Sequence, residues 1–172
     1  RGATVERFHH NDFDQLEELL RGDWTRPGII CLDGVNSMTG NVPDLPTVAA
    51  MAREHDALLY VDDAHGFGVI GERSADEPCS YGSRGNAIVR HFGEDYENIV
   101  LVAGFSKAYS SLLAFIACPT AVKRVLKTAA PPYLYSGPSP VASLATVLEG
   151  LKVNDQRGDE LRARLHELTG RV

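Results

Sequence analysis

The sequence predicts an α/β domain with a mostly parallel sheet that helices cover on both faces. Short apolar runs alternate with helical patterns along the chain, and this alternation is typical of βαβ units. Residues 28–33 are almost continuously apolar, which indicates a strand that is buried on both sides. A length of 172 residues with 44% hydrophobic and 23% charged residues fits one globular domain with a full-sized core.

The first half of the chain is predicted to alternate strands and helices. Strands are expected at residues 5–8, 28–33 and 57–61, and helices from about Asp12 to Arg21 and from Asp44 to His55. Gln15 follows Asp12 by three residues, as in a capping box. Pro43 and Pro46 fall near the first turn of the second helix, where proline is tolerated.

The second half begins with a loop rich in glycine, serine and charges. The predicted elements are this loop at 66–85, a short helix at 87–92, strands at 99–103 and 113–117, and a helix from Pro119 to about Thr128. A last long helix is expected to begin at Pro138 or Pro140 and to reach Leu168, with a weak point at Gly158.

Composition excludes several classes of protein. The net charge is -6 and there is no basic stripe, so we expect no nucleic-acid partner. The longest apolar run, 112–118, is too short to span a bilayer. Cys31, Cys79 and Cys118 are odd in number and lack metal-site spacing, which favours a reducing, cytoplasmic location.

Three residues with reactive side chains follow predicted strands. Asp62 and His65 come after the strand 57–61, and Lys107 comes after the strand 99–103. Ligands of open α/β sheets bind beyond the carboxyl ends of the strands, so these side chains are expected to meet there. A carboxylate, an imidazole and an amine are the groups that pyridoxal 5'-phosphate (PLP) needs at its pyridine nitrogen, phenolic oxygen and aldehyde.

Each of these residues also has a simpler interpretation. A single lysine is usually a solvated surface group, and Asp62 with Asp63 would suit a capped turn. Asp62, Asp63 and His65 would also suit a divalent metal, but the presence of Lys107 favours PLP, and we expect no metal. Glycines at 66–71 lack the following helix and acidic residue of a dinucleotide site.

Residues 62–72, Asp-Asp-Ala-His-Gly-x-Gly-Val-x-Gly-Glu, resemble the signature of the α-oxoamine synthases, a group of fold-type I PLP enzymes. Further similar blocks are His10-Asn11-Asp12, Ser37-Met38-x-Gly40 with Leu45-Pro46, and Phe105-Ser106-Lys107-Ala108. The resemblance covers nearly the whole chain. It implies the PLP-dependent transferase (aspartate aminotransferase-like) fold.

The resemblance also implies roles for single residues. Lys107 would be the Schiff-base lysine and proton shuttle, Asp62 would pair with the pyridine nitrogen, and His65 would contact the phenolic oxygen. Ser37 would lie close to the cofactor. Ser136 matches a position that reaches the phosphate in the partner subunit of such homodimers.

The chain departs from the family pattern around the lysine. Gly104 stands where members usually have a threonine whose hydroxyl helps to hold the phosphate, and Ser106 or Ser110 would have to compensate. Tyr109 to Leu113 replace a glycine-rich stretch. The family's ring-stacking histidine and carboxylate-binding arginine belong to regions outside these 172 residues.

By this resemblance, residues 1–137 would be the central part of a PLP-binding large domain. Residues 138–172 would be a long helix leading toward a carboxy-terminal domain that this chain lacks. The expected activity is condensation of an amino acid with an acyl-CoA or acyl-carrier-protein thioester, with decarboxylation, to give an aminoketone. The alternatives left open are a PLP-dependent aminotransferase and a non-catalytic scaffold that keeps the fold.

Overall fold

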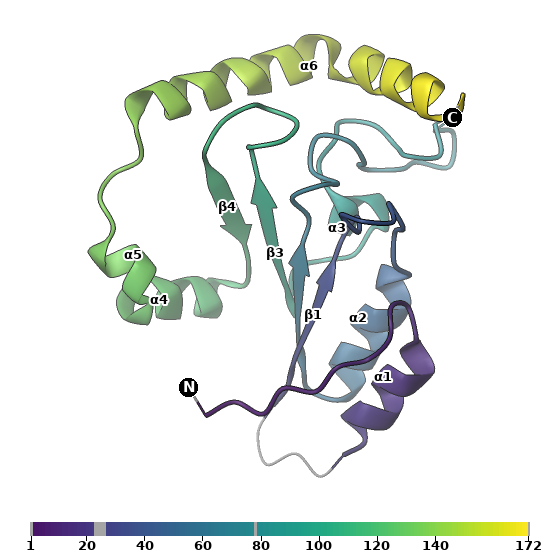
Figure 1. Ribbon diagram of the computed structural model, residues 1–172, viewed down its shortest axis with the longest axis vertical. Coiled ribbons are helices and arrows are strands. Elements are labelled where there is room, and N and C mark those ends of the chain that lie inside the picture. Colours follow the sequence, from purple (N-terminus) through teal and green to yellow (C-terminus); the bar gives the residue numbers. More distant parts are fainter. Residues whose placement is uncertain (1, 23–26, 78, 172) are drawn as a thin grey trace.

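The computed structural model describes residues 2–22, 27–77 and 79–171. Their strands form a sheet in the order β1-β2-β3-β4, shown in Figure 1. The strands are β1 (Ile29–Asp33), β2 (Leu58–Asp62), β3 (Ile99–Gly104) and β4 (Ala114–Ala117). The helices are α1 (Phe13–Leu20), α2 (Leu45–Glu54), α3 (Ile88–His91), α4 (Thr120–Ala129), α5 (Pro131–Tyr135) and α6 (Val141–Thr169).

The sheet is parallel except at one edge. β1 pairs with β2 and β2 with β3 in parallel register, whereas β3 and β4 are antiparallel. Residues 105–113 between β3 and β4 contain no helix, and a connection without a crossover returns the chain antiparallel. The register places Asp33 opposite Asp62, so the carboxyl ends of β1 and β2 lie side by side. The predicted mostly parallel α/β sheet is confirmed.

The core lies between the sheet and α2. Leu45, Val48, Ala49 and Ala52 of α2 are fully buried, and α2 contacts β2. On β1, however, Ile30 is buried while Ile29 is 64% exposed. The structure thus differs from the expected burial of this strand on both sides, because α4 and α5 lie beyond β4, away from β1 (Figure 1).

The helix caps follow the sequence prediction. The Asp12 carboxylate accepts a hydrogen bond from the Gln15 backbone N–H at 3.0 Å, and the Gln15 side chain accepts one from the His9 N–H at 2.6 Å. At α2 the Asp44 carboxylate accepts from the Thr47 hydroxyl at 2.7 Å. These bonds satisfy backbone and hydroxyl donors at the helix starts.

Two predictions of local structure need correction. Residues 5–8 form no strand: they are coil, Val5 is 78% exposed, and they pair with no strand of the sheet in the described residues. α5 was not predicted from the sequence. Pro131 opens it at the first helical position, where proline's fixed φ suits a helix.

Candidate active site

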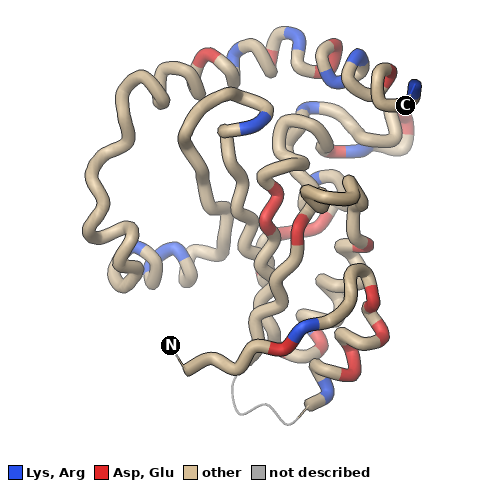
Figure 2. Tube along the Cα trace, in the orientation of Figure 1, with Lys and Arg blue, Asp and Glu red and all other residues tan. Residues whose placement is uncertain are grey.

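A pocket of about 150 Å³ opens at the carboxyl ends of the parallel strands. It is lined by Asp33, Val35, Ser37, Asp62, Ala64, His65 and Lys107. Figure 2 shows acidic positions where β1 and β2 end and a basic position in the connection between β3 and β4. The three residues singled out from the sequence, Asp62, His65 and Lys107, therefore share one cavity, as the position rule for open α/β sheets requires.

Asp62 is the last residue of β2 and is exposed. One of its carboxylate oxygens accepts a hydrogen bond from the Ala64 backbone N–H at 3.1 Å, and its carbonyl accepts one from the Gly34 N–H at 2.7 Å. Both bonds fix the chain where it leaves the strand. The carboxylate keeps an oxygen free to face a positively charged ring nitrogen in the pocket.

His65 lies in the turn that follows β2 and is half-buried. The turn is closed by the Phe67 N–H, which donates to the Asp63 carbonyl at 3.0 Å. The His65 ring makes no hydrogen bond with another described residue. Both of its nitrogens are therefore available to a ligand in the pocket.

Lys107 is exposed in the turn between β3 and β4. The Phe105 N–H donates to the Leu113 carbonyl at 2.8 Å and the Ser111 N–H to the Phe105 carbonyl at 3.0 Å, so the two ends of the turn are tied together. Its amine forms no ion pair with the described residues. An amine at a pocket without a fixed counter-ion is free to react with a carbonyl compound.

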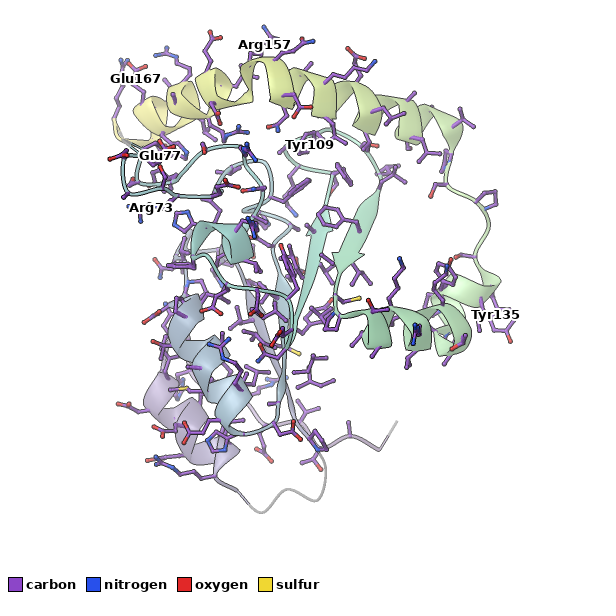
Figure 3. The ribbon with its side chains drawn as sticks, turned by 180° about the vertical axis from the view of Figure 1, so that it is seen from behind. Arg73, Glu77, Tyr109, Tyr135, Arg157 and Glu167 are labelled. Carbon is purple, nitrogen blue, oxygen red and sulfur yellow. The ribbon has the colours of Figure 1, made fainter. Side chains whose placement is uncertain are left out.

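Aromatic rings support the lysine turn from below. Phe67, Phe105, Tyr109 and Phe115 pack with ring centroids 5.0–5.6 Å apart. Figure 3 shows Tyr109 between the β3–β4 connection and α6. Tyr109, the first residue of the stretch 109–113, therefore anchors this turn through ring packing.

Of the three serines predicted to bind the cofactor, one lines the pocket and two do not. Ser37 lines the pocket, and its loop is held by the Asn36 side chain, which accepts from the Met38 and Thr39 N–H groups at 3.0 Å each. Ser106 is exposed beside Lys107 but does not line the pocket, and Ser136 lies in the connection between α5 and α6, where its hydroxyl donates to the Pro132 carbonyl.

Sequence reasoning missed Asp33 as a pocket residue, and it did not predict that Asp63 is buried. Asp33 lines the pocket, and the available signal was its place at the end of an apolar run, exactly as for Asp62. Asp63 is fully buried. Burial raises the pKa of Asp63 to about 6, although hydrogen bonds from the Ile88 and Gly66 backbones lower it in part, because desolvation disfavours the charged form.

The arrangement favours an organic cofactor over a metal ion. Among the described residues, no group of three or more His, Cys, Asp or Glu side chains is placed to hold a metal. Asp63 points into the protein interior, where its oxygens accept backbone N–H groups. The polar side chains that line the pocket are the amine of Lys107, the imidazole of His65, the hydroxyl of Ser37 and the carboxylates of Asp33 and Asp62.

The family model of aminotransferase class I and II matches residues 1–171. The chain belongs to this family. An 8-amino-7-oxononanoate synthase of Chromohalobacter salexigens is 41% identical over 167 residues, which is 96% of this chain and 40% of that protein. One from Methylobacillus flagellatus is 34% identical over 151 residues, 88% of this chain and 35% of that protein.

Solved structures of family members agree with the fold. A serine palmitoyltransferase from S. paucimobilis with a bound PLP-myriocin aldimine has a TM-score of 0.76 and 25% identity, over 92% of this chain and 38% of that one. The 8-amino-7-oxononanoate synthase of Francisella tularensis has a TM-score of 0.70 over 96% of this chain and 44% of that one, at 24% identity.

These comparisons confirm the resemblance to the α-oxoamine synthases and the PLP-dependent transferase fold. The chain spans about two fifths of the length of the curated relatives it matches.

Proposed function

We propose that this chain is the cofactor-holding part of a PLP-dependent acyltransferase. The whole protein would condense an amino acid with an acyl thioester, with loss of CO2, to give an aminoketone. The observation that carries the proposal is that Asp62, His65 and Lys107 line one pocket. The named relatives, 8-amino-7-oxononanoate synthases and a serine palmitoyltransferase, support the same class of reaction.

The three side chains fit PLP by their chemistry. Asp62 would hold the protonated pyridine nitrogen through its exposed carboxylate, and His65 would hydrogen-bond the phenolic oxygen through a ring nitrogen. Nζ of Lys107 would hold the aldehyde carbon. When bound, PLP supplies an electron sink that stabilises negative charge at the α-carbon of an amino acid.

Lys107 would also move the proton. Its neutral amine is the reactive form, and Nζ would accept the proton from the α-carbon of the amino acid. The Asp62 carboxylate would pair with the cationic ring nitrogen, since opposite charges stabilise each other. The α-carbon would then bond to the carbonyl carbon of an acyl-CoA or acyl-carrier-protein thioester while the C–S bond breaks and the thiol leaves. Loss of the amino acid's carboxyl group as CO2 would give the aminoketone.

Trapping of the lysine tests the cofactor proposal. The protein is incubated with PLP, reduced with borohydride and digested, and the modified peptide is identified by mass spectrometry. We expect the label on Lys107 and its loss in Lys107→Ala. The matched control, Lys123→Ala, removes an exposed lysine from α4 and should leave the labelling unchanged. Labelling spread over several surface lysines would contradict the proposal.

A second assay tests the reaction. Coenzyme A release from acyl-CoA is followed with glycine, alanine or serine as the amino acid. We expect release that depends on the amino acid and falls at least about 10³-fold in Lys107→Ala, because the lysine acts both as nucleophile and as base. Amino transfer to a keto acid without consumption of the thioester would show an aminotransferase instead.

A homodimer with active sites at the subunit interface is part of the same proposal. Ser136 is exposed, and the neighbouring Tyr133, Leu134 and Tyr135 are 59%, 46% and 85% exposed. An exposed apolar segment of this kind suits burial against a partner, and Ser136 would then reach the partner's phosphate site. Sedimentation analysis should show a dimer that the addition of PLP stabilises.

A cytoplasmic location completes the proposal. Cys31, Cys79 and Cys118 are all free thiols, which suits a reducing compartment. Within the described residues, none of the helices combines the length and apolar character that crossing a membrane requires.

A further inference from the structure

Asp63 lies beneath the pocket and is fully buried, with 0% exposure. A carboxylate costs several kcal/mol to bury unless hydrogen bonds replace its water. Its two flanking residues, Asp62 and Ala64, line the pocket, whereas Asp63 points away from it into the protein. The proposed chemistry makes no use of this buried acid.

The Asp63 carboxylate receives backbone N–H groups from separate segments of the chain. Oδ1 accepts from Gly66 at 3.1 Å, in its own turn. Oδ2 accepts from Ile88 at 2.8 Å, at the start of α3. The Val35 backbone, in the loop after β1, also acts to lower the pKa of Asp63, against the larger effect of burial.

Two glycines allow the loops to approach this carboxylate so closely. A Cβ atom at Gly34 or at Gly66 would overlap the carboxyl atoms of Asp63. Neither glycine has a positive φ, so it is the close approach, and not the backbone conformation, that requires glycine here. The loop after β1 and the turn after β2 are thus both packed directly on one side chain.

These two loops carry most of the pocket. Val35 and Ser37 belong to the loop after β1, and Ala64 and His65 belong to the turn after β2. The main chain of Asp63 is fixed as well: its N–H donates a hydrogen bond to the Val102 carbonyl of β3 at 2.8 Å.

We propose that Asp63 is a positioning residue, whose carboxylate holds the loops of Ser37 and His65 in the geometry that the cofactor ring needs. This inference rests on the proposed function for the identity of the cofactor. Each of the two carboxylate oxygens accepts one of the Gly66 and Ile88 N–H groups, while Gly34 brings the loop of Ser37 against the same carboxyl. An asparagine at this position would turn an NH2 group toward one of these donors, and that backbone N–H would be left without an acceptor.

The test compares Asp63→Asn with the wild-type protein. Asp76→Asn is the matched control, because it removes one negative charge from an exposed position of the same loop region. Amide hydrogen exchange is measured first, without PLP. We expect the amide of Gly66 or Ile88 to exchange about tenfold faster in Asp63→Asn, as for one lost hydrogen bond, and β3 amides to stay protected. Asp76→Asn should match the wild type.

PLP binding is measured next, by titration and by the visible circular dichroism of the bound cofactor. We expect Asp63→Asn to bind PLP about tenfold more weakly and to give a changed dichroism band, because the turn that carries His65 is no longer held in place. A merely structural role would lower the melting temperature and leave the band of the bound cofactor unchanged.

Unchanged exchange at Gly66 and Ile88 together with unchanged PLP affinity in Asp63→Asn would overturn the proposal. If Asp63→Asn does not fold, Gly34→Ala replaces it, because this variant presses a methyl group against the same carboxyl from the loop after β1. Weaker PLP binding is expected for Gly34→Ala too. Wild-type affinity and dichroism in Gly34→Ala would overturn the proposal. If the wild type itself binds no PLP, the proposed function fails. The exchange at Gly66 and Ile88 and the His65 ring signals in NMR spectra of Asp63→Asn still decide the role of Asp63.

Discussion

At the scale of single residues, Gly104 is the departure from the family pattern with the clearest consequence. It ends β3, three residues before Lys107. A Cβ atom built there would lie 3.5 Å from the Ser106 hydroxyl and 3.9 Å from the Ala64 methyl group, which are ordinary contact distances. The site therefore has room for a side chain beside Ala64, which lines the pocket.

We expect Gly104→Thr to bind PLP about three- to tenfold more tightly than the wild type, because the new hydroxyl gains one hydrogen bond to the phosphate. Gly104→Val is the matched control, since it has the same shape without the hydroxyl. The measurement is a PLP titration followed by absorbance. Equal affinity in both variants would show that the hydroxyl does not reach the phosphate.

The sequence pattern predicted the pocket residues that follow strands, but it did not predict the burial of Asp63. Asp62, His65 and Lys107 were predictable because each follows a strand, and strand ends of a parallel sheet converge. The burial of Asp63 could not be predicted, because it depends on loop residues 34, 35 and 66, which pack against its side chain. Such contacts leave no periodic signal in the sequence.

At the scale of elements, α6 is bound to the loop that follows the pocket. Arg162 is 5% exposed and donates to the side chains of Asn154 at 2.6 Å and Asp159 at 2.5 Å, and to the Gly68 carbonyl at 3.4 Å. Asp159 in turn accepts from the Arg84 backbone N–H at 2.7 Å. The hydrogen bond from the Arg162 guanidinium, and to a smaller extent the one from the Arg84 backbone, lower the pKa of Asp159.

The helix is interrupted where these contacts form. Arg157 has a φ of -149° inside α6, next to Gly158, where the sequence indicated a weak point. A Cβ at Gly158 would lie 2.5 Å from the Asn154 side chain and 2.9 Å from the Arg162 guanidinium. Glycine therefore leaves space for the Asn154–Arg162 hydrogen bond across the break.

We expect Arg162→Ala to reduce the free energy of unfolding by about 2–3 kcal/mol, because a buried side chain is removed together with its packing and its hydrogen bonds to Asn154, Asp159 and Gly68. Arg164→Ala is the control on the same helix. Arg164 pairs with Glu167 at 2.6 Å, but its side chain is 58% exposed, so about 0–1 kcal/mol is expected. Urea unfolding measures both. Equal losses would show that α6 is not held through Arg162.

At the scale of the whole molecule, the fold class followed from the alternation of apolar strands and helices, but the topology at the sheet edge did not. Strand 113–117 was predicted in nearly the right place. Its antiparallel direction depends on the absence of a crossover helix in the connection from β3. The segment 5–8 has strand-like residues, yet it does not pair with the sheet, and propensity alone does not predict pairing.

The pH dependence of stability is a property of the whole fold that Asp63 should affect measurably. Burial raises its pKa from 3.8 to about 6, so between about pH 4 and pH 6 the folded chain binds a proton more tightly than the unfolded chain. The contribution of Asp63 to the free energy of unfolding is therefore largest below this window and falls as the pH rises through it, by on the order of 3 kcal/mol.

We expect the wild type to lose stability relative to Asp63→Asn as the pH rises from 4.5 to 7.5. The quantity followed is the free energy of unfolding of the wild type minus that of the variant. Asparagine binds no proton, so the subtraction isolates Asp63 while the other titrating groups cancel. Urea unfolding at four pH values across this range measures the difference. A constant difference would mean that the buried carboxyl titrates with its ordinary pKa, and that the backbone N–H groups of Gly66, Ile88 and Val35 offset the cost of its burial.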